Sequence, residues 1–383
     1  MKLEGVRVLD LSLYLPGPHL TMMMADHGAD VIKVEPPGLG EPVREIGLKQ
    51  GGETVWFRNT HRGKRSVQLN LKAEAGREAF LALAETADVV VEAFRPGVVD
   101  RLGIGYQAVS ARNKGIVYAS IAAFGQTGPL RDTPAHDLAI EAHAGVVSLN
   151  LGRDGAPASP HMPVADLTGS LMALSGILMA LLRRTETGRG DYIDISMQDA
   201  TMGWLPNVVG PVFAEDKAAV VKDQRSFGGN AFYRIYETKD GRFVVLGGVE
   251  PKFVRNLLTA LGREDLVEVA TSGPGPHQDG VRAFLADTFS RKTRDEWVDW
   301  FDGRDICFAP VLDLHEAFHA PQVAAREMML RDEDGNLHIG IPIKFRDEPG
   351  RVNTRLPAVG EHTDDALREA GLDAATVAAA KPS

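Results

Sequence analysis

Some acid and base side chains of this 383-residue sequence stand where a loop is predicted to give way to a helix. His136 lies in TPAHDLAIEAHAG, Asp166 in MPVADLTGSLMALSG and Glu250 in VLGGVEPKF. An imidazole titrates near neutral pH, so His136 could take or donate a proton. Asp166 could share that work if its surroundings shield or pair its carboxyl group.

Each of these residues also has an ordinary structural interpretation. His136 could be a partly buried surface histidine, although Ser, Thr, Asn or Asp would cap a helix better. Asp166 could be the N-cap of the helix that follows, and the same helix start could offer backbone N–H groups to an anionic intermediate. Glu250 could be a loop carboxylate that the next helix dipole stabilises.

Basic side chains crowd into the stretch RNTHRGKRSVQLN. They are Arg58, His61, Arg62, Lys64 and Arg65. A solvated loop would account for them. The alternative is a phosphate site, because cations clustered before a buried strand can neutralise a polyanion. Arg95 and Arg101 flank RPGVVDRLG just after a predicted parallel strand, where such sheets hold ligands, so they could extend that site.

The sequence lacks several common site motifs. LYLPGPHL stands where G-x-G-x-x-G would follow the first strand, which disfavours a dinucleotide site. His136 and His143 would lie two helical turns apart and Cys307 is the single cysteine, so we expect no metal site and no disulfide. The formal net charge of -10 argues against nucleic acid as the main partner.

The pattern of elements predicts an α/β fold. Strand VRVLDLS, helix GPHLTMMMADHG and strand DVIKVE form a β-α-β unit, which favours a parallel sheet. A helix at 73–87 and the strands DVVVEAF and GIVYASIAAF repeat the pattern. The predicted hairpin AFYRIYETKDGRFVVLGG then ends the alternation of parallel strands and helices. We predict a large domain at 1–224, a smaller α+β domain at 225–320 and a final segment at 321–383.

The longest apolar run, Leu167 to Leu182, is short for a membrane span, which needs about 20 residues. We expect it to be a buried helix and expect no membrane partner. The N-terminal MKLEGVRVLDLS is typical of a strand and not of a signal core, and a single cysteine suits a reducing compartment. These features predict a soluble, cytoplasmic protein.

Several segments, taken together, resemble one family. They are GVRVLDLS, GPHLTMMMADHGADVIKVEPPG, NTHRGKRSVQLNLK, ADVVVEAFRPGVVDRLG, FGQTGP, ETGRGDYIDISMQDA and GGNAFYRIYETKDG. The sequence resembles the family III CoA-transferases, a group that includes the α-methylacyl-CoA racemases and the carnitine CoA-transferases. The resemblance runs across nearly the whole chain in the order of the family, which makes it far more specific than any single segment.

This resemblance implies a Rossmann-like large domain, a smaller α+β domain and a C-terminal segment that returns to the large one. It implies an interlocked homodimer. It also implies that coenzyme A enters as part of a thioester substrate and is not a permanently bound cofactor. Its phosphates and adenine would be met by Arg62, Lys64, Arg65, Arg95 and Arg101.

The resemblance implies two chemistries at Asp166. Transferases of the family use the matching aspartate as a nucleophile toward an acyl-CoA, whereas the racemases use it with a histidine, here His136, as acid and base. A glutamate matching Glu250 would support that histidine. We prefer racemisation of a 2-methylacyl-CoA, although DISMQDA is more typical of the transferases. A non-catalytic acyl-CoA-binding scaffold is a third possibility.

One position departs from the family pattern. Pro36 follows Glu35, where the family often has an arginine that contacts coenzyme A. Lys33 and Arg44 are the nearby cations that could replace that contact.

Overall fold

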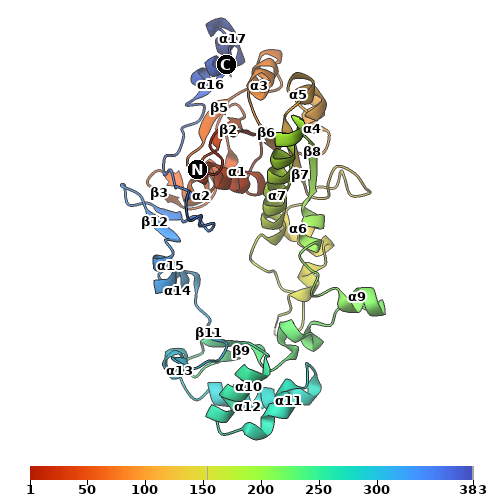
Figure 1. Ribbon diagram of the computed structural model, residues 1–383, viewed down its shortest axis with the longest axis vertical. Helices are drawn as coiled ribbons and strands as arrows, with labels where there is room; N and C mark the ends of the chain where they lie inside the picture. The colour runs from red at the N-terminus through yellow and green to blue at the C-terminus, as the bar shows by residue number, and fades with distance from the viewer. Residues whose placement is uncertain (153, 382–383) are drawn as a thin grey trace. The chain divides into compact units, whose positions relative to one another are not determined.

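The structure is a computed structural model that describes residues 1–152 and 154–381 (Figure 1). The chain divides into two compact units. Unit 1 comprises Met1–Asn150, Ala158–Trp204 and Pro321–Ser383, and unit 2 comprises Leu151–Pro157 and Leu205–Ala320. The functional division at 1–224, 225–320 and 321–383 stays a prediction.

Unit 1 is built on a six-stranded parallel sheet with the strand order β5-β2-β1-β6-β7-β8. Its strands are β1 (Arg7–Asp10), β2 (Asp30–Glu35), β5 (Arg65–Gln68), β6 (Val89–Glu92), β7 (Val117–Ala122) and β8 (Tyr192–Ser196). Counted along the sheet, this is the 3-2-1-4-5-6 order of a doubly wound Rossmann fold. The prediction of an α/β fold with a parallel sheet is confirmed.

The strands β1, β2, β6 and β7 are buried on both faces, which explains their nearly continuous apolar runs. Alternate side chains enter opposite cores, since successive residues of a strand point to opposite faces. Val8 packs into the core beneath α1 and α7, whereas Leu9 packs into the core beneath α3. Val89 and Val90 divide in the same way.

The sheet is covered by helices on both faces (Figure 1). The helices of unit 1 are α1 (Pro16–Asp26), α2 (Val55–His61), α3 (Glu74–Glu85), α4 (Val98–Arg101), α5 (Tyr106–Arg112), α6 (Asp137–His143), α7 (Val164–Thr187), α8 (Met197–Met202), α15 (Pro321–Ala325), α16 (Thr363–Glu369) and α17 (Ala374–Ala380). The C-terminal α17 packs on α3, and α16 packs on β5 and α3. The last helices therefore complete one face of the sheet.

The long helix α7 differs from its predicted form in two respects. It begins at Val164, before the expected start at Leu167, and much of its apolar surface is exposed, including Met179 at 68% and Leu182 at 73%. By length and composition alone α7 could cross a membrane, but core helices of soluble proteins meet the same criterion. Since only one stripe of α7 faces the sheet, the expectation of a buried helix was wrong for this chain by itself.

The basic stretch is not a loop. Its first half forms α2, whose start is capped by the Thr54 hydroxyl accepting from the Phe57 N–H, and its second half enters β5. Two short hairpins, β3 (Lys49–Gln50) with β4 (Glu53–Thr54) and β12 (Met329–Arg331) with β13 (Leu337–Ile339), complete the strands of unit 1.

Unit 2 has its own antiparallel sheet, in the order β11-β10-β9, and its own core. Its elements are α9 (Gly210–Glu215), β9 (Tyr233–Glu237), β10 (Phe243–Gly247), α10 (Pro251–Ala260), α11 (Val267–Thr271), α12 (Asp279–Phe289), α13 (Arg294–Phe301), β11 (Phe308–Pro310) and α14 (Leu314–Phe318). The hairpin predicted around Lys239 joins β9 to β10. Phe289 and Trp297 lie in the core that the helices share with this sheet.

Candidate active site

A largely apolar cavity of about 590 Å³ opens at the carboxyl ends of β1, β2, β5 and β6. The strand order reverses between β1 and β6, and open α/β sheets bind ligands at that point. Its lining residues are Leu11, Leu13, Val34, Glu35, Pro36, Pro37, Leu69, Asn70, Leu71, Lys72, Phe94, Val98 and Leu102. The cavity is therefore the best-placed ligand site of unit 1.

Cations lie at and beside the rim of this cavity. Lys72 lines it, and Arg95 and Arg101 adjoin its lining residues Phe94 and Leu102. All three cations are exposed, and none has an ion-pair partner among the residues that the structure describes. Lys72 was not predicted, because a lone lysine after a strand carries no sequence signal.

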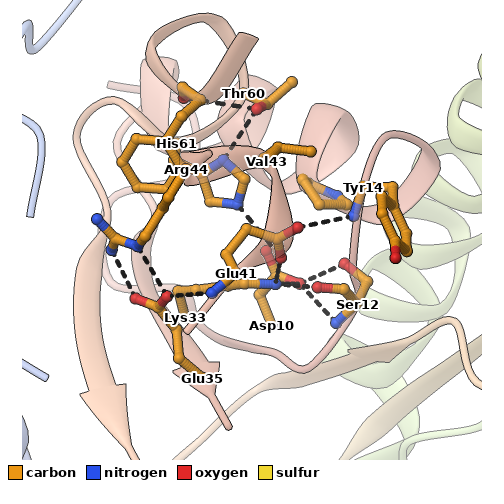
Figure 2. A network of polar contacts seen from close by, with 12 residues as sticks. Asp10, Ser12, Tyr14, Lys33, Glu35, Glu41, Val43, Arg44, Thr60 and His61 are labelled. Atoms are coloured by element: carbon orange, nitrogen blue, oxygen red, sulfur yellow. Dashed lines mark hydrogen bonds and ion pairs between the residues drawn. The ribbon is translucent and has the colours of Figure 1, made fainter. Parts of the chain in front are cut away.

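Glu35, which lines the cavity, also belongs to a buried network of charged groups (Figure 2). Lys33 Nζ is 3.1 Å from Glu41 Oε2 and 3.7 Å from Asp10 Oδ1, and Arg44 forms two hydrogen bonds of 2.6 and 2.9 Å with Glu35. Both cations are buried and engaged. Lys33 and Arg44 are therefore not free to replace the arginine that the family often has at position 36.

The basic residues of the α2–β5 segment also have internal partners. Arg62 donates to Asp26 at 2.6 and 3.1 Å, and Lys64 donates to Asp10 at 2.9 Å. Arg65 pairs with Asp30 at 2.6 Å and with Glu369 of α16 at 3.0 Å. Arg62 and Lys64 are almost fully buried. These contacts favour a structural role for Arg62 and Lys64, whose charges are buried against carboxylates, whereas Arg65 is partly exposed. Binding of coenzyme A phosphates by these three residues stays a prediction.

Lys64 supports a prediction about stability. Burial lowers its pKa to about 8, against the attraction of Asp10, and its Nζ also donates to Pro18 O and Thr21 Oγ1. Lys64→Ala should lower the free energy of unfolding in urea by about 3 kcal/mol, because it removes one partner of a buried charge pair. The matched change Lys49→Ala, at an exposed pair with Glu45, should cost less than about 1 kcal/mol. Equal losses in the two variants would contradict a structural role for Lys64.

His136 is the N-cap residue of α6, but its side chain makes no capping bond. The imidazole is therefore not used by the helix, and it is exposed. The ring of Tyr14 meets it edge-on, with the ring centroids 6.5 Å apart. Tyr14 has a positive φ of 65°, rare for a tyrosine, and its N–H donates to buried Glu41 at 3.0 Å. The buried network thus fixes the segment after β1 that contacts His136 (Figure 2).

Asp166 is the third residue of α7 and not its N-cap, a position that Pro163 occupies. Two of the first N–H groups of α7 are bound by side chains of α6 instead. Asp137 Oδ1 accepts from the Asp166 N–H at 3.1 Å, and Glu141 Oε1 accepts from the Val164 N–H at 3.1 Å. The starts of α6 and α7 therefore meet, and His136 directly precedes the residue that bonds Asp166.

The surroundings of Asp166 favour its protonated form. Burial, together with the negative charge of Asp137, raises the pKa of Asp166 to about 7. A carboxyl group with a pKa near the working pH can both donate and accept a proton. Neither Asp137 nor Glu141 was predicted as a site residue, although their i, i+4 spacing places them on one side of a helix.

The whole chain can be compared with known proteins. Residues 3–363 match the profile of CoA-transferase family III. The chain is 33% identical to human α-methylacyl-CoA racemase over 384 residues, covering 97% of this chain and 94% of that protein. It is 34% identical to acetyl-CoA:oxalate CoA-transferase of Acetobacter aceti over 348 residues, covering 89% and 88%. The chain belongs to CoA-transferase family III.

The fold comparison agrees with this membership. The crystal structure of a CAIB/BAIF family protein from Brucella suis matches with a TM-score of 0.82 at 28% identity, covering 96% of this chain and 98% of that one. The similar proteins include both a racemase and a CoA-transferase. The family predicted from the sequence is confirmed.

The remaining candidate of this family III enzyme, Glu250, lies in unit 2. It is the N-cap residue of α10, its side chain makes no capping bond, and it is exposed. Its carboxylate is thus not needed to cap α10. The predicted support of His136 by Glu250 stays a prediction.

Proposed function

We propose that this protein is an α-methylacyl-CoA racemase, which removes the proton α to a thioester and returns a proton to the opposite face. The observation that carries this proposal is the carboxyl group of Asp166, held beside other carboxyl groups with a pKa of about 7. A proton donor and acceptor needs such a pKa, whereas a nucleophilic carboxylate is more effective when it is fully ionised.

The proposed mechanism uses one group for each face of the α-carbon. In one direction His136 removes the proton while Asp166 donates one, and in the other direction the roles exchange. The enolate formed between these steps needs stabilisation of its oxygen. We propose that Glu250 supports His136 in this work, as the family resemblance implies. No bond between enzyme and substrate forms in this scheme.

The second candidate is a CoA-transferase in which Asp166 attacks the thioester carbonyl. The comparable identity to the oxalate CoA-transferase of Acetobacter aceti supports it. In this scheme Asp166 forms a mixed anhydride and then an enzyme-bound CoA thioester, so a carboxylate acceptor is required for turnover.

Hydrogen exchange in heavy water distinguishes these candidates. The protein is incubated with a 2-methylacyl-CoA and no acceptor acid, and deuterium at the α-carbon is measured by mass spectrometry. A racemase incorporates deuterium. A transferase does not, but transfers CoA once a carboxylate is added. A scaffold binds the thioester and does neither, so either of the last two results would overturn the proposal.

We propose that the cavity at the carboxyl ends of β1, β2, β5 and β6 holds the coenzyme A part of the substrate. Its proline, leucine and phenylalanine side chains suit the flat face of adenine, and Lys72, Arg95 and Arg101 suit the phosphates. Coenzyme A would enter and leave with each substrate and not stay as a cofactor.

Arg95→Ala and Arg101→Ala should each weaken binding of acyl-CoA by about 1.5–3 kcal/mol, since each removes a charge-assisted contact. Calorimetry measures the affinity, which should also fall as salt rises. Arg346→Ala removes the same charge from a side chain that is 95% exposed and should leave affinity unchanged. Equal affinity in all variants would place the phosphates elsewhere.

We also propose a second copy of this chain as the partner of unit 1. The exposed apolar residues of α7 support this, namely Met172, Leu178, Met179 and Leu182. The family resemblance implies an interlocked homodimer, which would cover such a face. Light scattering should give twice the chain mass, and a monomer at micromolar concentration would contradict it. A cytoplasmic location stays a prediction.

A further inference from the structure

The segment after β1 carries a tyrosine in a strained backbone conformation. Tyr14 has a φ of 65°, in the left-handed region that favours glycine. Strained residues of this kind persist only where their surroundings hold them, and they are frequent at active sites. Packing of its own side chain does not explain the strain, because Tyr14 is 41% exposed and its hydroxyl group has no hydrogen-bond partner among the residues that the structure describes.

Buried charged groups hold the backbone of this segment. The Ser12 N–H donates to Asp10 Oδ1 at 3.0 Å, and Lys33 Nζ donates to the Ser12 carbonyl oxygen. Two residues further on, the Tyr14 N–H donates to Glu41 Oε1 at 3.0 Å. Lys33 Nζ joins the two anchors, since it is 3.1 Å from Glu41 Oε2 and 3.7 Å from Asp10 Oδ1. These charged side chains are at most 1% exposed, so the network fixes the strained backbone from within the protein.

The side chain of Tyr14 has a different neighbour from its backbone. Figure 2 shows the Tyr14 ring outside the network that binds its N–H group. The ring meets the imidazole of His136 with the ring planes at 85° and the centroids 6.5 Å apart. This is the edge-to-face arrangement that aromatic pairs prefer. In the described part of the chain, no other ring contact and no side-chain hydrogen bond of His136 is found, so Tyr14 is its one fixed neighbour of this kind.

We propose that Tyr14 is a positioning residue whose ring keeps the imidazole of His136 in one orientation. The buried network holds the backbone of Tyr14, and the ring of Tyr14 limits where the imidazole can lie. This inference rests on the proposed function for the role of His136 as acid and base, whereas the contact between the two rings does not. A general base must lie within hydrogen-bond reach of the proton that it removes, so its orientation affects the rate.

The test compares Tyr14→Gly with Tyr14→Phe. Glycine removes the ring and adopts the same φ without strain, so this variant should unfold at the same or a higher urea concentration than the unmodified protein. Phenylalanine keeps the ring and removes only the hydroxyl group. A change that appears in Tyr14→Gly and not in Tyr14→Phe therefore belongs to the ring contact and not to lost stability.

Nuclear magnetic resonance of protein labelled with ¹³C in its histidines reports the imidazole directly. The His136 signal is assigned by its loss in His136→Asn, and the ring current of Tyr14 should shift it. In Tyr14→Gly the signal should move toward that of a freely exposed histidine, and in Tyr14→Phe it should stay in place. His143, whose ring packs on Phe124, is the internal control and should not move in either variant. A His136 signal that is unchanged in Tyr14→Gly overturns the inference.

The rate of α-proton exchange tests the consequence for the reaction. Tyr14→Gly should lower kcat by about a hundredfold, the size expected for a reacting group displaced by about 1 Å. KM should stay the same, because Tyr14 does not line the cavity proposed for coenzyme A. Tyr14→Phe should restore the rate. An undiminished rate in Tyr14→Gly, or an equal loss in Tyr14→Phe, overturns the inference.

The two measurements separate this inference from the proposed function. If the unmodified protein exchanges no α-proton, the proposed function fails. The shift of the His136 signal in Tyr14→Gly still decides whether Tyr14 positions the imidazole.

Discussion

His136→Asn should lower the rate of α-proton exchange by about one hundred- to ten-thousand-fold in at least one stereochemical direction, the range typical of a lost general acid or base. Asparagine cannot take a proton at neutral pH. It should not disturb the start of α6, because the His136 side chain makes no capping bond and asparagine is a good N-cap residue. Exchange from the R and S thioesters is measured separately in heavy water.

His143→Asn is the matched control for this variant. His143 lies in the last turn of the same helix, two turns away, and its ring packs on Phe124. Its substitution should leave both exchange rates within a few fold of the original. Acyl-CoA affinity should be similar in both variants. Unchanged exchange of both enantiomers by His136→Asn would make His136 a structural residue and would remove the basis of the racemase proposal.

Asp166→Ala should abolish exchange in at least one direction and leave acyl-CoA binding nearly intact. The loss should be of the same order as for His136, since racemisation needs a group on each face. The helix should survive because Asp166 is not the N-cap and its N–H still has Asp137 as an acceptor. Circular dichroism checks the helix content, and calorimetry checks binding.

Mass spectrometry of the quenched reaction separates the two roles of Asp166. As an acid and base, Asp166 should carry no covalent adduct during turnover with a 2-methylacyl-CoA, even when hydroxylamine is added as a trap. As a nucleophile, it must pass through an acyl or CoA adduct. A modification mapped to Asp166, present with substrate and absent from Asp166→Ala, would replace the racemase by the transferase.

The pKa of Asp166 also sets the direction of a pH effect. A carboxyl group with a pKa of about 7 loses its proton as the pH rises through 7. The direction in which Asp166 donates should therefore slow above pH 7. The opposite direction should slow with it, because the proton is then needed on His136 and the equilibrium between the two stereoisomers does not depend on pH. A kcat/KM that stays constant above pH 7 in both directions would contradict this assignment.

The sequence by itself determined the parallel sheet and the family. The apolar runs of β1, β2, β6 and β7 alternate with amphipathic helices, and this local pattern leaves few arrangements other than a doubly wound sheet. It also placed His136 correctly at the start of α6, because the helix begins where the apolar period begins.

The tertiary structure alone decided which cations are free. The sequence predicts a phosphate site from the closely spaced Arg62, Lys64 and Arg65. In the structure each of them pairs with a carboxylate distant in sequence, namely Asp26, Asp10 and Asp30 in that order. Arg95 and Arg101 have the same charge and are exposed beside a cavity. The charge of a side chain follows from its residue type. Its ion-pair partner depends on distant chain segments that only the fold brings together.

The same reason explains the environment of Asp166. The sequence identified it as a carboxylate near a helix start, but its pKa depends on burial and on Asp137, which precedes it by 29 residues. Glu141 had no signal because a glutamate in an amphipathic helix is ordinarily solvated. Packing of α6 against α7 buries Glu141, and desolvation then changes what this carboxyl group can do.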